Sequence, residues 1–70
     1  MKILVVVEQT GTGHSAYAPD FPGCVASGQS RDEVERAMRE AIELHIEGLR
    51  ADGVEVPEPQ AYVTMVEVAA

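Results

Sequence analysis

The sequence predicts a small α+β domain: a two-layer sandwich in which one helix lies across one face of a mostly antiparallel four-stranded sheet. Three observations predict it. Short alternating runs of β-branched residues lie near both ends of the chain, one helix has clear start and stop signals, and turn residues separate these segments. The expected order is β-β-β-α-β. No repeat or low-complexity tract divides the chain, so we expect residues 1–70 to form a single domain.

The first two strands are expected near the N-terminus. Residues 3–7 are all Ile, Leu or Val, and a run that is apolar on both faces is typical of a buried strand. Gly11 and Gly13 then favour a hairpin loop, and residues 15–18 return as the second antiparallel strand. A phosphate-binding loop would need a helix directly after its glycines, whereas here a strand follows.

A rigid corner joins the second strand to a third strand at residues 24–28. It consists of Pro19, Asp20, Phe21, Pro22, Gly23 and Cys24. Each proline lacks an N–H and has φ fixed near about −65°, so neither can lie inside a central strand, while Gly23 can adopt the positive φ that closes a turn. We expect Phe21 to anchor the corner in the core and Asp20 to accept hydrogen bonds from nearby backbone amides.

One helix follows, and both of its ends are marked. Ser30 and Glu33 form a capping box at its start, and Gly53 is the expected C′ residue. Apolar positions recur between them at three- and four-residue steps, and they comprise Val34, Ala37, Met38, Ala41, Ile42, His45 and Leu49. Leu44 and Ile46 lie on opposite flanks of this stripe, so we expect one flank to meet a second subunit.

His45 and Gly48 are the unusual residues of the helix. A structural role for His45 in the core or at a subunit interface is favoured over catalysis, because no companion ligand lies at a suitable spacing. Gly48 costs about 1 kcal/mol relative to Ala inside a helix, which leaves two interpretations open: a close backbone approach or a tolerated defect. The candidate interface residues are Leu44, His45, Ile46, Gly48 and Leu49.

A last strand is expected after the helix. Pro57 and Pro59 make residues 57–59 a stiff extended connector that cannot be helical. Residues 61–68 then alternate Tyr62, Thr64, Val66 and Val68 with Ala61, Val63, Met65 and Glu67. We therefore expect residues 61–68 to complete the four-stranded sheet.

The charge balance excludes several functions. Five Lys and Arg residues against twelve Asp and Glu give a net charge of −7, which argues against direct binding to nucleic acid. The acidic surface is consistent with simple solubility or with a basic protein partner, and composition does not separate the two. No apolar run approaches the roughly 20 residues that cross a bilayer, and no targeting segment is recognisable. With a single cysteine, the chain fits a reducing cytoplasm.

No catalytic, cofactor-binding or metal site is predicted. A nuclease of the ribonuclease H type needs several carboxylates that converge on divalent metal ions, and the candidates are Asp20 in the corner and Glu8 near the end of the first strand, which do not make a convergent set. Cys24 is expected to be a small buried residue, because no basic neighbour in the sequence would lower its pKa.

Self-association is predicted from excess apolar surface. Leu4 and Val6 on the first strand, with Val66 and Val68 on the last, lie on the alternation that a single helix does not cover. We expect a homodimer, with a tetramer as the second alternative.

Three segments together resemble the HicB family. They are residues 15–26, which include the Pro-Asp-Phe-Pro-Gly-Cys corner, residues 40–49 with Glu47-Gly48-Leu49, and residues 56–59 with Pro57-Glu58-Pro59. The resemblance implies a partly degraded ribonuclease H-like fold that no longer cleaves RNA and acts as the antitoxin of a toxin–antitoxin pair, covering a small basic ribonuclease toxin. Longer members of that family contain a C-terminal DNA-binding module, which we do not expect in this sequence.

The leading functional hypothesis is therefore a non-enzymatic, HicB-type antitoxin-like domain that binds such a toxin. The alternative is a solitary homo-oligomeric regulatory or ligand-binding module without a toxin partner. An active metal-dependent nuclease is the third hypothesis.

Overall fold

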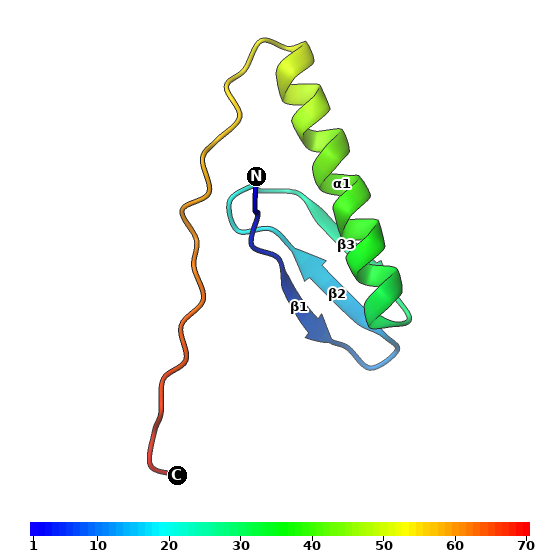
Figure 1. The fold of residues 1–70 in the computed structure, drawn as a ribbon. Coiled ribbons are helices and arrows are strands. Elements are labelled where there is room, and N and C mark those ends of the chain that lie inside the picture. Colours follow the sequence, from blue (N-terminus) through cyan, green and yellow to red (C-terminus); the bar gives the residue numbers. More distant parts are fainter.

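The computed structural model describes residues 1–70 as a three-stranded antiparallel sheet with one helix across one face (Figure 1). The strands β1 (Val6–Gln9), β2 (His14–Tyr17) and β3 (Val25–Gly28) are hydrogen-bonded in the order β1-β2-β3. The helix α1 (Arg31–Ala51) follows directly and packs mainly against β3 and β2. The predicted α+β class, the single helix and three antiparallel strands are confirmed, but β1 begins at Val6 rather than at Ile3.

The sheet has one face under the helix and one open face. The strand register aligns Val7 with Ala16 and Ala26, a row of small or branched side chains on the face beneath α1. The adjacent row on the opposite face is Val6, Tyr17 and Val25. Because side chains alternate along a strand, this second row belongs to the open face, where Tyr17 is 43% exposed and Val25 is 65% exposed.

Both ends of α1 are capped by the residues around them. The Ser30 hydroxyl accepts a hydrogen bond from the Glu33 amide (3.1 Å), and the Glu33 carboxylate accepts one from the Gln29 amide (2.7 Å) rather than from Ser30 itself. At the other end, the Gly53 amide donates to the Arg50 carbonyl and the Val54 amide to the Leu49 carbonyl, with Gly53 at φ +69°. This is a Schellman motif. The helix is not sufficiently apolar to span a membrane.

The core lies between α1, β2 and the corner that follows β2. Its buried residues are Ala16, Ala18, Phe21, Cys24, Val34, Met38 and Ile42. Phe21, at 1% exposed, is the largest of them. Seven buried residues form a small core, consistent with a chain of 70 residues.

The expected fourth strand is not present, and this corrects the prediction of a four-stranded sheet. Residues 54–70, called the tail here, run extended past the sheet without joining it (Figure 1). No hydrogen bond joins residues 62–70 to the rest of the chain. The radius of gyration is 14.0 Å, against about 11 Å for a compact chain of this length. An alternating sequence is compatible with a strand, but a strand forms only where an edge supplies its hydrogen bonds.

Candidate protein-interaction surfaces

The corner between β2 and β3 holds the tail at residues 60 and 61. The Asp20 carboxylate accepts hydrogen bonds from the amides of Gln60 (3.1 Å) and Ala61 (3.2 Å). Gly23 has φ +85°, and the Cys24 amide donates to the Phe21 carbonyl, so the corner is itself a tight turn. Asp20 bonds to amides 40 residues away rather than within its own turn. The corner therefore determines where the tail leaves the domain.

Phe21 and His45 connect this corner to the helix. Their rings pack edge to face, with centroids 5.4 Å apart and an interplanar angle of 66°. This is the favourable arrangement for two aromatic rings, because the positive edge of one meets the negative face of the other. His45 is partly buried. Its ring contacts Phe21 of the same chain, which is a structural role within the subunit.

The other residues of the expected helix interface have different exposures. Leu44 is 70% exposed, whereas Ile46 and Leu49 are partly buried against the core. Gly48 is exposed, and a Cβ added to it would meet nothing within 4 Å. Neither the sheet nor any other segment of the chain closely approaches the helix at Gly48.

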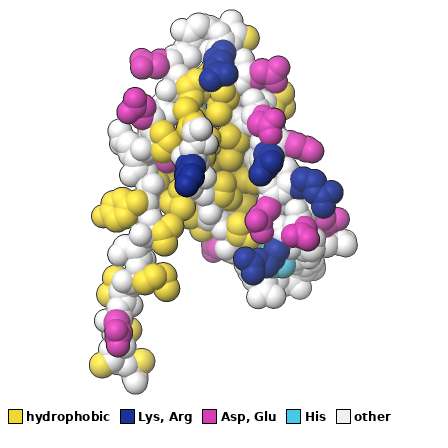
Figure 2. All heavy atoms as spheres, in the orientation of Figure 1, with side chains coloured by type: hydrophobic (Ala, Val, Ile, Leu, Met, Phe, Trp, Pro, Cys, Tyr) yellow, Lys and Arg dark blue, Asp and Glu magenta, His cyan; other side chains and the backbone are white.

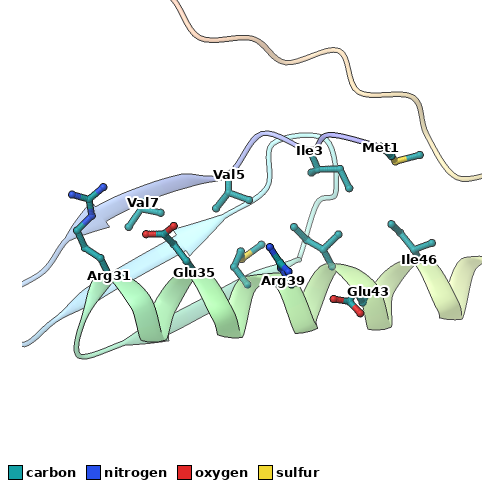
Figure 3. Close-up of a pocket in the computed structure, with 11 residues that line it drawn as sticks. Met1, Ile3, Val5, Val7, Arg31, Glu35, Arg39, Glu43 and Ile46 are labelled. Atoms are coloured by element: carbon teal, nitrogen blue, oxygen red, sulfur yellow. The ribbon is translucent and has the colours of Figure 1, made fainter.

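An apolar groove lies between the β1 side of the sheet and α1 and is called the β1–α1 groove here (Figure 3). Figure 3 shows Ile3, Val5 and Val7 pointing toward the helix, which contributes Met38, Ile42 and Ile46 to the lining. Charged residues of α1 line its outer rim: Arg31, Glu35, Arg39 and Glu43. Its volume of about 800 Å³ leaves room for several side chains.

The groove exists because α1 is displaced toward β3. The helix packs mainly on β3 and β2, so its flank beside β1 is left without a covering element. Figure 2 shows hydrophobic side chains gathered between the helix and the tail, and further hydrophobic side chains along the tail. The molecule thus has an uncovered apolar groove and an uncovered apolar segment on the same side.

The tail is the most exposed apolar part of the chain. Tyr62 is 82% exposed and Met65 is 91% exposed, and Val63, Val66 and Val68 are also largely exposed. Monomeric soluble proteins rarely leave so many neighbouring large apolar side chains in water. Such a group of exposed apolar side chains is typical of an interaction surface.

Catalytic chemistry has little support from the arrangement of side chains. No group of three or more His, Cys, Asp or Glu side chains is placed to hold a metal ion. Asp20 is engaged by the tail amides, and Glu8 is exposed on β1. Burial raises the pKa of the Cys24 thiol, which makes it a poorer nucleophile at neutral pH. His14 borders a polar hollow near the start of α1, and its buried Nδ1 has no hydrogen-bond partner.

Two features were missed by reasoning from the sequence. The β1–α1 groove depends on the offset of the helix across the sheet, for which the sequence has no local signal. The second is a close backbone approach: a Cβ on Gly28 would lie 2.7 Å from the Val34 amide nitrogen, and one on Gly13 would lie 2.5 Å from the Gly28 carbonyl oxygen. The presence of glycine at the end of β3, two residues before the helix N-cap Ser30, was the available signal.

Comparison with known proteins identifies related chains. The family model described as "HicB_like antitoxin of bacterial toxin-antitoxin system" matches residues 2–69. A UPF0150 protein of Helicobacter pylori is 42% identical over 52 residues, which cover 74% of this chain and 72% of that protein. An uncharacterised 14.9 kDa protein of Haemophilus phage HP1 is 36% identical over 53 residues, which cover 76% of this chain but only 40% of the phage protein.

A solved structure also shares the fold. It is a "HicA3 and HicB3 toxin-antitoxin complex", one chain of which matches with a TM-score of 0.65 and 27% identity. The match covers 83% of this chain and 72% of that chain.

Proposed function

Because the chain belongs to the HicB-like antitoxin family, we propose that it is a non-enzymatic antitoxin domain that binds and neutralises a small basic ribonuclease toxin. The observation that carries this proposal is the family match over residues 2–69, which includes the whole sheet, the helix and nearly all of the tail. The similarity to a chain of a HicA3–HicB3 complex supports a toxin as the partner. In this proposal the chain acts in the cytoplasm, where its toxin would meet RNA.

The charge of the chain supports a basic partner. The net charge is −7, and acidic residues lie along the exposed side of α1, among them Glu40, Glu43 and Glu47. Opposite charge accelerates the encounter of two proteins and disfavours acidic competitors. A small basic toxin is the complementary class of partner.

The test uses the product of the gene adjacent to this one, if it encodes a short basic protein. Expression of that product alone should arrest growth, and co-expression with this chain should restore it. The two purified proteins should elute together in size-exclusion chromatography. A toxic neighbour that neither binds this chain nor is relieved by it contradicts the proposal.

The alternative, a homo-oligomeric regulatory or ligand-binding module, is favoured by one observation: the apolar surface of the tail and the β1–α1 groove is uncovered within one subunit. A homodimer without affinity for the adjacent protein would support this alternative. An active nuclease, the third hypothesis, requires RNA cleavage with magnesium or manganese that follows the protein through purification and is lost in Asp20→Ala.

A further inference from the structure

We propose that two copies of this chain exchange their tails, so that residues 62–68 of each copy form a fourth strand on the β1 edge of the other and cover its β1–α1 groove. The proposal deepens the homodimer expected from the sequence and assigns its contact surface. It does not depend on a toxin, because every contact involves only copies of this chain.

The first argument is that the edge and the strand are both unpaired. In the order β1-β2-β3, the outer edge of β1 has free N–H and C=O groups. Residues 62–70 likewise make no hydrogen bond to the rest of the chain. An extended segment adds readily to such an edge, because each satisfies the other's backbone groups.

The second argument is the match of side chains. Residues Val63, Met65 and Glu67 share one side of an extended segment, and Ile3, Val5 and Val7 line the groove at the same two-residue spacing. If the tail runs parallel to β1 and to residues 3–5, which lead into it, Val63 lies beside Ile3 and Glu67 lies beside Val7. Arg31 lies at the Val7 end of the groove (Figure 3).

Charge favours this direction over its opposite. Glu67 is the only charged side chain after residue 58. In the parallel direction its carboxylate approaches Arg31, the outermost residue of the groove rim, with Glu35 next along the helix. In the antiparallel direction it would lie toward Ile46, the end of the groove where the rim residue is Glu43 (Figure 3). Like charges at close range are unfavourable, so the parallel arrangement is the one we infer.

The other alternation of the tail fits the open face of the sheet. Tyr62, Thr64, Val66 and Val68 would lie on that face, where Val66 extends the row that already includes Val6 and Tyr17. The added strand therefore meets apolar surface on the open face at Val66 and in the groove at Val63 and Met65.

The tail pairs with β1 of a second copy, rather than with β1 of its own subunit, because of how the tail is held. Asp20 binds the amides of Gln60 and Ala61, and Pro57 and Pro59 stiffen the connector before them. With this geometry the tail runs past its own β1 without a hydrogen bond to it (Figure 1). A two-fold axis lets both tails and both edges pair at once, which closes the assembly.

The first experiment measures dimerisation of single-proline variants by sedimentation equilibrium. Adjacent residues of a strand point their N–H groups to opposite sides, so either Met65→Pro or Val66→Pro must remove an amide that faces β1. The more affected of the two should weaken dimerisation by about tenfold or more, while Ala69→Pro, beyond the segment, should not. Residues 62–70 make no contact with their own domain through hydrogen bonds, so these variants should fold, and circular dichroism checks this.

The second experiment distinguishes exchange of tails between two copies from pairing of a tail with β1 of its own subunit. A chain with Val5→Cys and Met65→Cys in a Cys24→Ala background is oxidised and examined on a non-reducing gel. Exchange yields a covalent dimer, whereas closure within a subunit yields a cross-linked monomer and overturns the proposal. The control pair, Thr12→Cys with Met65→Cys, should remain uncross-linked.

Hydrogen exchange on the unmodified protein provides a check that needs no variant. Amides 62–68 should be protected in the isolated protein and lose protection on dilution to monomer. A monomer at all concentrations, a dimer with an unprotected tail, or a tail protected only when the adjacent toxin is added would each overturn strand exchange. The last outcome would support the proposed antitoxin function and assign the tail to the toxin instead.

Discussion

At Asp20, one carboxylate joins two segments that are 40 residues apart in the sequence. It accepts hydrogen bonds from the Gln60 and Ala61 amides, the last residues of the tail that are hydrogen-bonded to the domain. The corner around it is rigid, because its two prolines restrict φ and Phe21 is buried. A short turn motif thus determines where a long exposed segment begins.

We expect Asp20→Ala to free the tail from residue 60 onward. The two amides lose their acceptor, and a hydrogen bond to a charged group contributes about 1.5–3 kcal/mol, less where water can replace it as it can at Gln60. Hydrogen exchange at amides 60 and 61 should accelerate, and the free energy of unfolding should fall by about 1 kcal/mol. Glu58→Ala, a neighbouring exposed acid, is the control and should change neither quantity.

Cys24 should make stability decline at alkaline pH. Burial raises the pKa of its thiol, so the folded state keeps the proton at a pH where the unfolded state has lost it. The stabilisation is complete below the unfolded pKa of about 8.5 and is lost as the pH rises through the higher folded pKa. Urea denaturation of the wild type and Cys24→Ala across this range measures the effect. Parallel pH profiles would contradict it.

Gly28 should not tolerate a side chain. A Cβ there would lie 2.7 Å from the backbone nitrogen of Val34, so strand β3 and the first turn of α1 would have to separate. Gly28→Ala should destabilise the fold by about 1–3 kcal/mol in chemical denaturation. Gly11→Ala, with nothing within 4 Å of its Cβ, should stay within about 0.5 kcal/mol of the wild type.

At the scale of elements, the position of α1 on the sheet creates the binding surfaces. The helix covers β3 and β2, and its capping residues connect it almost directly to β3. The short connection between Gly28 and Arg31 holds the helix over β3, so β1 is left at the uncovered side. The β1–α1 groove is a consequence of this connection.

A substitution at Gly48 tests whether α1 closely contacts a second subunit in addition to the sheet. Nothing lies within 4 Å of its Cβ position, so Gly48→Ala should gain helix propensity and stabilise the protein by up to about 1 kcal/mol. The midpoint of thermal unfolding should rise, and the dimer should be unaffected. A weakened dimer would instead place Gly48 in a close helix contact between subunits, as one interpretation of the sequence expected.

At the scale of the whole molecule, charge determines which partners the chain can bind. Its net charge of −7 comes from twelve acidic and five basic side chains, and the groove includes two of those five, Arg31 and Arg39. Binding to a polyanion depends on several cations that displace counterions together. The chain lacks such a set.

We therefore expect the purified chain to leave duplex DNA and single-stranded RNA unretarded in a gel at physiological salt and micromolar protein. The same protein should bind the basic toxin proposed as its partner, with an association rate that falls as salt is added. A salt-sensitive shift of nucleic acid by this chain alone would contradict the charge argument.

The sequence by itself determined the α+β class, the first three strands, the capped helix and the family, because these depend on local periodicity, capping residues and turn chemistry. Ser30, Glu33 and Gly53 identified the helix ends, since helix caps are formed by residues close in the chain. Only the tertiary structure decided that Asp20 holds the tail, that α1 leaves a groove beside β1, and that residues 61–68 remain outside the sheet. These depend on distant segments meeting in space. An alternating pattern specifies a strand's faces but not the edge to which it binds.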